Sequence, residues 1–385
     1  MDDSRKKYWK EFLTKEQIQF IQAHLTEDIN LIGQLGQIPA PTRAEEQRAA
    51  FIKGWLEEQG AQGVYIDEAK NVVYPYHCEE GGPIVVVAAH MDIVFPDMQT
   101  LPLRLEDGKM YAPGIGDDTA CLVQLLMTAK YVTQEAFTPA CGILFVADSC
   151  EEGLGNSDGC RRILEAYEGR VKKFISFDRY MGQLTSRAVG SYRYRITVRT
   201  EGGHSYQDFG NANAIYYLSS MIQTLYARKA PSQAKTTWNV GRIEGGTTVN
   251  SIAQEASMLY EFRSESLECL QEMEEFFQFV MATYRRMGIE LEAERVGLRP
   301  CALGVDEKKL KKLTQKNKQI VETVTGKPCE VDASSTDANI ALSMGIPANT
   351  IGTIRGQGAH TREEWIDLAS VEEGFAITMA VITGL

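Results

Sequence analysis

The chain has 385 residues, and its content of 44% hydrophobic and 24% charged residues is typical of a soluble globular protein with about two domains. The net charge of −12 argues against nucleic acid or an anionic membrane as a partner, because phosphate binding needs a basic surface. No apolar run approaches the roughly 20 residues of a membrane span, and the eight cysteines form no CxxC motif, which favours reduced thiols of a cytosolic protein.

Helices and buried strands alternate through the first half of the chain. The N-terminal stretch MDDSRKKYWKEF lacks the apolar segment of a signal peptide. Apolar spacing and β-branched runs then predict helices at 15–35, 44–59 and about 122–129, and strands at 64–74, 84–89, 142–148 and 173–178. This alternation predicts an α/β fold with a mostly parallel or mixed sheet that is covered by helices.

The pattern changes near residue 189 and changes back near residue 300. The intervening elements are expected to be strands at 191–200, 238–243 and 256–262 and helices at 212–227 and 267–287. Beyond them we expect a helix at 308–325, a short helix capped by Thr336 and a strand at 346–352. The sequence therefore predicts a catalytic domain, 1–188 with 300–385, that is interrupted by an inserted α+β domain at 189–299.

Histidine and acidic residues gather where these elements begin and end. They are His90, Asp92, Asp117, Asp118, Glu151, Glu152, Asp178 and His360. In open α/β sheets, chemistry collects at the carboxyl ends of the strands. Imidazole and carboxylate ligands suit zinc, and also manganese or cobalt. Two metal ions would need about five ligands and a bridging carboxylate, and the remaining acids could orient a ligand histidine or accept a proton from water.

Each motif also has a simpler interpretation. A His-x-Asp sequence can be a polar strand end, and an Asp-Asp pair before a helix can be an N-cap with a favourable dipole contact, which is all that Asp118 need be. Asp337, beside Thr336, is likewise expected to stabilise the first turn of a helix. Jointly, however, five such segments at strand and helix ends favour a metal site.

The ordered set H-M-D (90–92), G-D-D-T-A (116–120), E-E-G (151–153), S-F-D (176–178) and G-A-H-T (358–361) resembles the co-catalytic di-zinc peptidases. Peptidase T, carboxypeptidase G and succinyl-diaminopimelate desuccinylase typify this family, and peptidase T is nearest in type. The resemblance spans nearly the whole chain. It implies a homodimer that forms through the inserted domain, which is a lid in this family.

The resemblance implies two Zn²⁺ per subunit, with Mn²⁺ or Co²⁺ as alternatives. His90 and Asp178 would bind one ion, and Glu152 and His360 the other. Asp117 would bridge the two ions, and a cis peptide bond would join it to Asp118.

Two acidic residues take other roles by the same resemblance. Asp92 would orient His90, and Glu151 would be the general base and then the acid that protonates the leaving amine. Thr119 and Cys150 depart from the family pattern, since Lys or Met is common at the first position and an acid at the second. Neither position is a ligand, so these departures leave the expected metal site intact.

The lid motifs resemble the residues that hold substrate in the family. They are His204 in GGHS, Asn250 in TTVNSIA and Arg263 in EFRS. An imidazolium and an amide can stabilise an oxyanion, and an arginine can bind a carboxylate with two hydrogen bonds. In relatives the histidine often reaches across the dimer. Gly358, near His360, would let the substrate backbone approach closely.

These residues predict a cytosolic, metal-dependent amidohydrolase that cleaves small peptides as an aminopeptidase. An N-acyl-amino-acid deacylase or a carboxypeptidase remains open, because one Arg263 can bind the carboxylate of any of these substrates. A binding protein that kept only the fold would be expected to lack a ligand or the base, and none is lacking.

Overall fold

The computed structural model describes residues 6–385. By their contacts the residues divide into two compact units, Met1–Arg187 with Leu303–Leu385, and Ala188–Ala302. The second unit begins and ends within a few residues of the expected insertion at 189–299. Within the described part of the chain, no helix combines the length and apolar character needed to cross a membrane.

The first unit is built on an eight-stranded mixed sheet with the order β1-β2-β6-β3-β7-β16-β8-β15. Its strands are β1 (Tyr65–Ile66), β2 (Val72–Tyr76), β3 (Ile84–His90), β6 (Gly142–Asp148), β7 (Val171–Phe177), β8 (Gln183–Ala188), β15 (Glu330–Ser334) and β16 (Ala348–Ile351). A smaller sheet, β17-β18-β5-β4, contains β4 (Arg104–Glu106), β5 (Lys109–Tyr111), β17 (Gly356–Gln357) and β18 (Trp365–Asp367).

Parallel pairing in the middle of the large sheet brings the ends of its strands together. β3 lies between β6 and β7 and is parallel to both, and β16 is parallel to β7. The register pairs His90 with Asp148 and Ala88 with Ser176. The carboxyl ends of β3, β6 and β7 therefore meet at one edge of the sheet.

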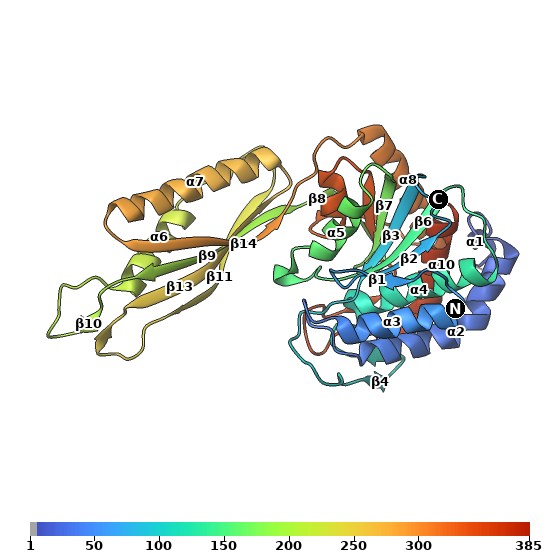
Figure 1. Cartoon of the computed structure of the whole chain (residues 1–385), viewed down its shortest axis with the longest axis horizontal. Helices are drawn as coiled ribbons and strands as arrows, with labels where there is room; N and C mark the ends of the chain where they lie inside the picture. The colour runs from blue at the N-terminus through green and yellow to red at the C-terminus, as the bar shows by residue number, and fades with distance from the viewer. Residues whose placement is uncertain (1–5) are drawn as a thin grey trace. The chain divides into compact units, whose positions relative to one another are not determined.

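Helices cover this sheet, and Figure 1 shows α2, α3 and α4 along one side of it. The helices of the unit are α1 (Lys6–Trp9), α2 (Lys15–Gly36), α3 (Glu46–Glu58), α4 (Ala120–Gln134), α5 (Asp158–Ala166), α8 (Glu307–Thr325), α9 (Ala338–Ser343) and α10 (Val371–Thr383). Val85, Val87 and Ala89 of β3 belong to the large apolar core that α2, α4, α8 and α10 share. β3 is buried over its whole length, which explains its continuous apolar sequence.

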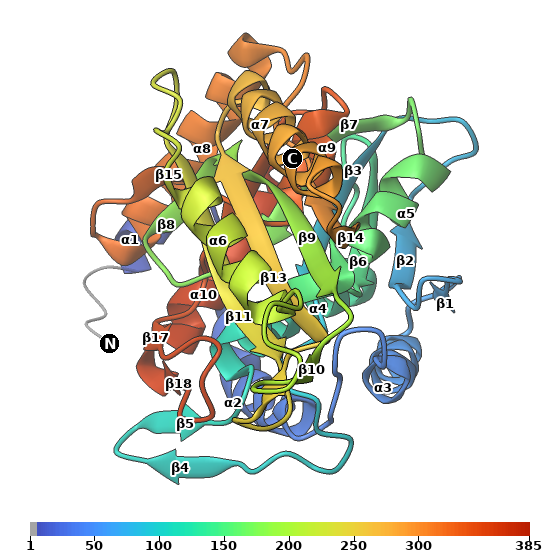
Figure 2. The same ribbon diagram turned by 90° about the vertical axis from the view of Figure 1, so that its left-hand side faces the viewer.

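The second unit is a four-stranded antiparallel sheet with two helices on one face. The sheet order is β11-β13-β9-β14, and its strands are β9 (Gly190–Arg199), β11 (Thr236–Gly245), β13 (Glu255–Ser264) and β14 (Glu290–Arg299). The helices α6 (Ala214–Tyr226) and α7 (Leu267–Arg286) pack on the same side of this sheet, in front of it in Figure 2. A two-stranded antiparallel sheet of β10 (Gly203–His204) and β12 (Ser251–Ile252) completes the unit.

The predicted fold class is confirmed, and the structure differs from the prediction in its details. The sequence interpretation did not include β14, although its residues alternate between buried and exposed positions at Leu291 and Glu292. The large sheet is parallel only in its middle, because β1, β2 and β8 run antiparallel to their neighbours.

Candidate metal centre

His90 is the last residue of β3 and is buried. Its Nε2 atom lies 3.1 Å from Oδ1 of Asp117. Its Nδ1 atom lies 3.1 Å from the carbonyl oxygen of Asp92 and 3.4 Å from Oδ1 of the same residue. The ring is thus held from one side by Asp92 and presents its other nitrogen to Asp117.

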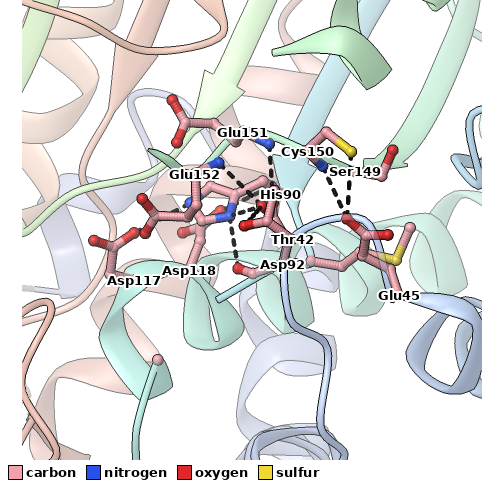
Figure 3. A network of polar contacts seen from close by, with 12 residues as sticks. Thr42, Glu45, His90, Asp92, Asp117, Asp118, Ser149, Cys150, Glu151 and Glu152 are labelled. Carbon is pink, nitrogen blue, oxygen red and sulfur yellow. Dashed lines mark hydrogen bonds and ion pairs between the residues drawn. The ribbon is translucent and has the colours of Figure 1, made fainter. Parts of the chain in front are cut away.

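Asp92 connects this histidine to the segment that carries the two glutamates. Its carboxylate accepts hydrogen bonds from the amides of Glu151 and Glu152, both at 3.0 Å, and from the hydroxyl of Thr42 at 2.8 Å (Figure 3). Burial alone would raise the pKa of Asp92, but the hydrogen bond and charge of His90 lower it below its usual value. Asp92 is therefore a fixed anion between the histidine and the glutamates.

Asp117 and Asp118 lie in an irregular turn before α4 and are joined by a cis peptide bond. Oδ2 of Asp118 accepts a hydrogen bond from the backbone amide of His90 at 3.1 Å. Thr119, not Asp118, occupies the N-cap position of α4, and no side chain caps the helix there. The interpretation of Asp118 as an N-cap is therefore wrong, because its carboxylate is directed to β3 instead.

His360 and Glu152 complete the cluster from two other loops. Nε2 of His360 lies 3.0 Å from Oε1 of Glu152 and 3.2 Å from Oδ2 of Asp117. His360 has a φ of 64°, in the left-handed region. Gly358, with a φ of 87°, shapes this turn: its carbonyl accepts hydrogen bonds from the amide and hydroxyl of Thr361.

Three groups of side chains in residues 6–385 could hold a metal ion. In each group the ligand atoms lie within 4.8 Å of one another, and the groups are His90, Asp117 and Asp178; Asp117, Glu152 and His360; and His90, Glu151 and Glu152. Asp117 belongs to both the first and the second group. Asp178, which follows β7 directly, and Glu151 are both buried.

The carboxylates of this cluster lie so close together that they favour a bound cation. Burial, and then the charge of Asp117, raise the pKa of Asp178 to about 8. Burial raises the pKa of Glu152 to about 7, although the hydrogen bond with His360 opposes the shift. Hydrogen bonds to Asp117 and Glu152 raise the pKa of His360 to about 11. Carboxylates and imidazoles packed in this way fit metal ions, which bind these groups in place of protons.

Several residues that hold the cluster were not found from the sequence. Glu364 is buried and accepts hydrogen bonds from the amides of Gly114 at 2.8 Å and Gly116 at 3.2 Å, so it supports the turn that carries Asp117. Asn71 accepts one from the amide of Ser149 at 3.0 Å. In the sequence, only the position of Glu364, four residues after His360, indicates that it lies near the cluster.

Asp337 and Thr336 differ from their predicted roles. Thr336 does not cap α9, because its hydroxyl lies 2.7 Å from the hydroxyl of Thr350. Asp337 occupies the N-cap position but makes no capping hydrogen bond. It is buried beside Asp148, and burial raises its pKa well above the usual value. Both residues belong to the buried polar interior behind the cluster.

The predicted substrate residues of the second unit lie in two places. His204 is exposed on β10 and pairs with Ser251 of β12, and the carbonyl of Asn250 accepts the amide of Ser205 at 3.0 Å, so His204 and Asn250 are neighbours. Arg263 lies near the end of β13 and donates two hydrogen bonds of 2.9 Å to Glu261. The structure brings the first two residues together and keeps Arg263 apart.

A helix-covered mixed sheet with a buried cluster of carboxylates and imidazoles at its strand ends is the architecture of a metal-dependent hydrolase. The chain belongs to peptidase family M20/M25/M40, whose model matches residues 86–384. The expected relationship to di-zinc peptidases is thereby confirmed at the level of the family.

Individual relatives cover nearly the whole chain. It is 25% identical over 362 residues to a succinyl-diaminopimelate desuccinylase of Corynebacterium glutamicum, which covers 92% of this chain and 95% of the relative. Aminopeptidase PepT of Bacillus cereus superposes with a TM-score of 0.69 at 20% identity, over 93% of this chain and 98% of that one. The Bacillus subtilis protein YXEP, described as a dinuclear metal-binding peptidase, superposes with a TM-score of 0.63 at 18% identity, over 94% and 98%.

Proposed function

We propose that this protein is an aminopeptidase of the peptidase T type that cleaves small peptides with two zinc ions. The observation that carries the proposal is the position of Asp117, whose Oδ1 lies 3.1 Å from His90 and whose Oδ2 lies 3.2 Å from His360. In this proposal His90 and Asp178 would hold one ion, Glu152 and His360 would hold the other, and Asp117 would be shared by both. Mn²⁺ or Co²⁺ would fit the same oxygen and nitrogen ligands. The dinuclear metal binding described for YXEP supports the count of two.

The catalytic steps that the chain's own residues perform are proton transfers and orientation. Bound metal ions would supply Lewis acidity toward the scissile carbonyl and toward water. Glu151 then takes the proton of the attacking water and passes it to the leaving amine. The hydrogen bond from its amide to Asp92 fixes the backbone of Glu151, and Asp92 also holds His90 in place.

His204 and Asn250 would donate to the developing oxyanion, and Arg263 would bind a substrate carboxylate. Arg263 and the β10–β12 pair lie at opposite ends of β13. The eight steps from Glu255 to Arg263 span about 26 Å at roughly 3.3 Å per residue. A small peptide cannot reach both ends of that strand. We therefore infer that one substrate meets Arg263 of one subunit and His204 with Asn250 of another.

The second unit has an apolar surface that a second copy of the chain would cover. Ile215 and Tyr216 of α6 are 41% and 67% exposed, and Ile243 of the neighbouring β11 is 51% exposed. β11 is also an edge strand. Exposed apolar groups beside an open strand edge are typical of an interface. We propose that homodimerisation uses this α6–β11 surface.

The Ile215→Glu substitution is expected to convert a dimer into a monomer, because it places a charge in the proposed apolar contact. Activity should fall by at least about 10-fold if His204 acts on the partner's substrate. Sedimentation velocity and hydrolysis rates measure both effects. Phe279→Glu, which changes an exposed residue of α7, is the matched control and should remain dimeric. A wild-type chain that is fully active as a monomer would contradict the proposal.

Hydrolysis of a matched panel by zinc-loaded protein tests the substrate class. The panel contains free-amine dipeptides and tripeptides, their N-acetylated forms and their C-amidated forms. An aminopeptidase should cleave the free-amine peptides and lose activity on acetylation. The relative named as a desuccinylase favours a second candidate, an N-acyl-amino-acid deacylase, which would prefer the acylated forms. A carboxypeptidase would instead lose activity on amidation.

We also propose that the enzyme works in the cytosol. All eight cysteines are free thiols, and six of them are buried. Unpaired cysteines in this number are typical of proteins in a reducing compartment.

A further inference from the structure

Arg48 lies in the first turn of α3 and is completely buried. Its Nε and Nη2 atoms donate hydrogen bonds to the carbonyl of Ile38 at 3.1 and 2.8 Å. Its Nη1 atom donates to the carbonyl of Met91 at 2.8 Å and to Oγ1 of Thr119 at 3.3 Å. One guanidinium thus joins three segments that are distant in the sequence.

Two of these segments carry residues of the metal centre. Met91 stands between His90 and Asp92, and Thr119 follows the Asp117-Asp118 pair. The hydroxyl of Thr119 also donates to the carbonyl of Gly114 at 2.6 Å, so it closes the turn that carries Asp117. The segments of His90 and Asp117, whose side chains lie 3.1 Å apart, are therefore also connected through Arg48.

The start of α3 holds the third segment of the centre as well. Glu45, which immediately precedes the helix, is buried, and its Oε1 accepts a hydrogen bond from the amide of Cys150 at 3.2 Å (Figure 3). The same oxygen accepts a hydrogen bond from the amide of Arg43 at 2.7 Å. Cys150 directly precedes Glu151. Glu45 and Arg48, both at the start of α3, thus contact the segments that bear His90, Asp117 and Glu151.

The charge of Arg48 is unusual for its position. Within the described residues the guanidinium forms no salt bridge and is satisfied by carbonyl and hydroxyl oxygens. Burial lowers its pKa to about 10, which leaves it charged at neutral pH, and the carboxylate of Asp92 favours that charge. A buried cation is costly, and an apolar side chain of similar length would fill the space without that cost. We therefore infer that this position needs the hydrogen-bond donors of the Arg48 guanidinium.

We propose that Arg48 is a positioning residue of the metal centre, which fixes the spacing of the two ligand-bearing segments by holding the Met91 carbonyl and the Thr119 hydroxyl together. This inference rests on the proposed function, because it assumes that His90 and Asp117 bind metal.

The inference is tested with Arg48→Met, which keeps the length of the side chain and removes every donor, and with Thr119→Val, which removes the link to the second segment together with the hydrogen bond to Gly114. Zinc affinity is measured by competition with a chelator, and kcat and KM by peptide hydrolysis. Arg48→Met should weaken zinc binding and lower kcat by about 10- to 100-fold each, the usual effect of losing a residue that orients a ligand. KM should change by less than about 2-fold, because no substrate contact is lost.

Thr119→Val should show the same pattern at smaller size, and it keeps the test decisive if Arg48→Met fails to fold. Thr119→Ser, which restores the hydroxyl, should rescue both zinc affinity and kcat. The cobalt(II)-loaded forms add a spectroscopic readout, since a displaced ligand changes the visible absorption bands. Arg162→Met changes an exposed arginine of α5 and is the matched control.

The outcomes separate this inference from the proposed function. Folded Arg48→Met and Thr119→Val proteins that melt at lower temperature but bind zinc and turn over like wild type would overturn the inference and leave the proposed function standing. A wild-type protein that binds no zinc at the cluster would overturn both.

Discussion

Replacing Glu151 with glutamine is expected to lower kcat by about 10²- to 10⁴-fold, the usual contribution of a general base. The amide has almost the shape of the carboxylate but cannot accept the proton of water. The backbone of residue 151 should keep its hydrogen bond to Asp92, so the neighbouring Glu152 should stay in place. Metal analysis after dialysis should therefore find two zinc ions per chain in the variant.

Glu80→Gln provides the matched control, because it makes the same change at an exposed glutamate. It should leave both zinc content and kcat unchanged. The assigned mechanism would be contradicted by a Glu151→Gln variant with wild-type activity. Loss of zinc together with activity would instead identify Glu151 as a ligand, as its place in a group with His90 and Glu152 allows.

Asp117→Asn is expected to disturb both metal positions at once. The carboxylate presents Oδ1 to His90 and Oδ2 to His360, and a carboxamide can offer only one oxygen. Zinc content should fall from two ions to one or none, and activity should fall by more than about 100-fold, the upper range for residues that merely support a ligand. Zinc content by mass spectrometry and peptide hydrolysis measure the two effects.

His360→Ala is the informative comparison, because it removes a proposed ligand that belongs to only one of the three groups. This variant should retain one zinc ion at His90 and Asp178. If Asp117→Asn kept both ions, or if His360→Ala lost both, Asp117 would not be the bridge.

The proposed metal ligands could be located in the sequence because of where they stand in the chain. His90 and Asp178 each end a buried strand, and the carboxyl ends of parallel strands meet at one edge of the sheet. The order of the motifs then matched a known family. His360 was placed less directly, because the strand before its loop, β16, ends at Ile351 and the short strand β17 lies between them.

The residues that hold those ligands could not be predicted. Arg48, Asn71 and Glu364 are single polar residues with no periodicity or motif, and each acts on a segment far away in the chain, as Glu364 does on Gly114. Only tertiary contacts reveal such partners. Local rules also misplaced Asp118, because an acid before a helix resembles an N-cap until a competing backbone amide is known to lie nearby.

The inserted unit shows a further limit of sequence reasoning. His204, Asn250 and Arg263 were grouped because one family resemblance joined them. The distance between them depends on the run of β13, which a list of motifs does not contain. Because a small peptide cannot span that distance, the three candidates can contact one substrate only if two subunits contribute them.

The most direct test of the metal centre is an anomalous difference map at the zinc absorption edge from crystals of the zinc-loaded protein. The account predicts two peaks on either side of the Asp117 carboxylate, about 3.5–4 Å apart. One peak should lie beside His90 and Asp178, and the other beside Glu152 and His360. A single peak, or two peaks that do not share Asp117, would contradict it.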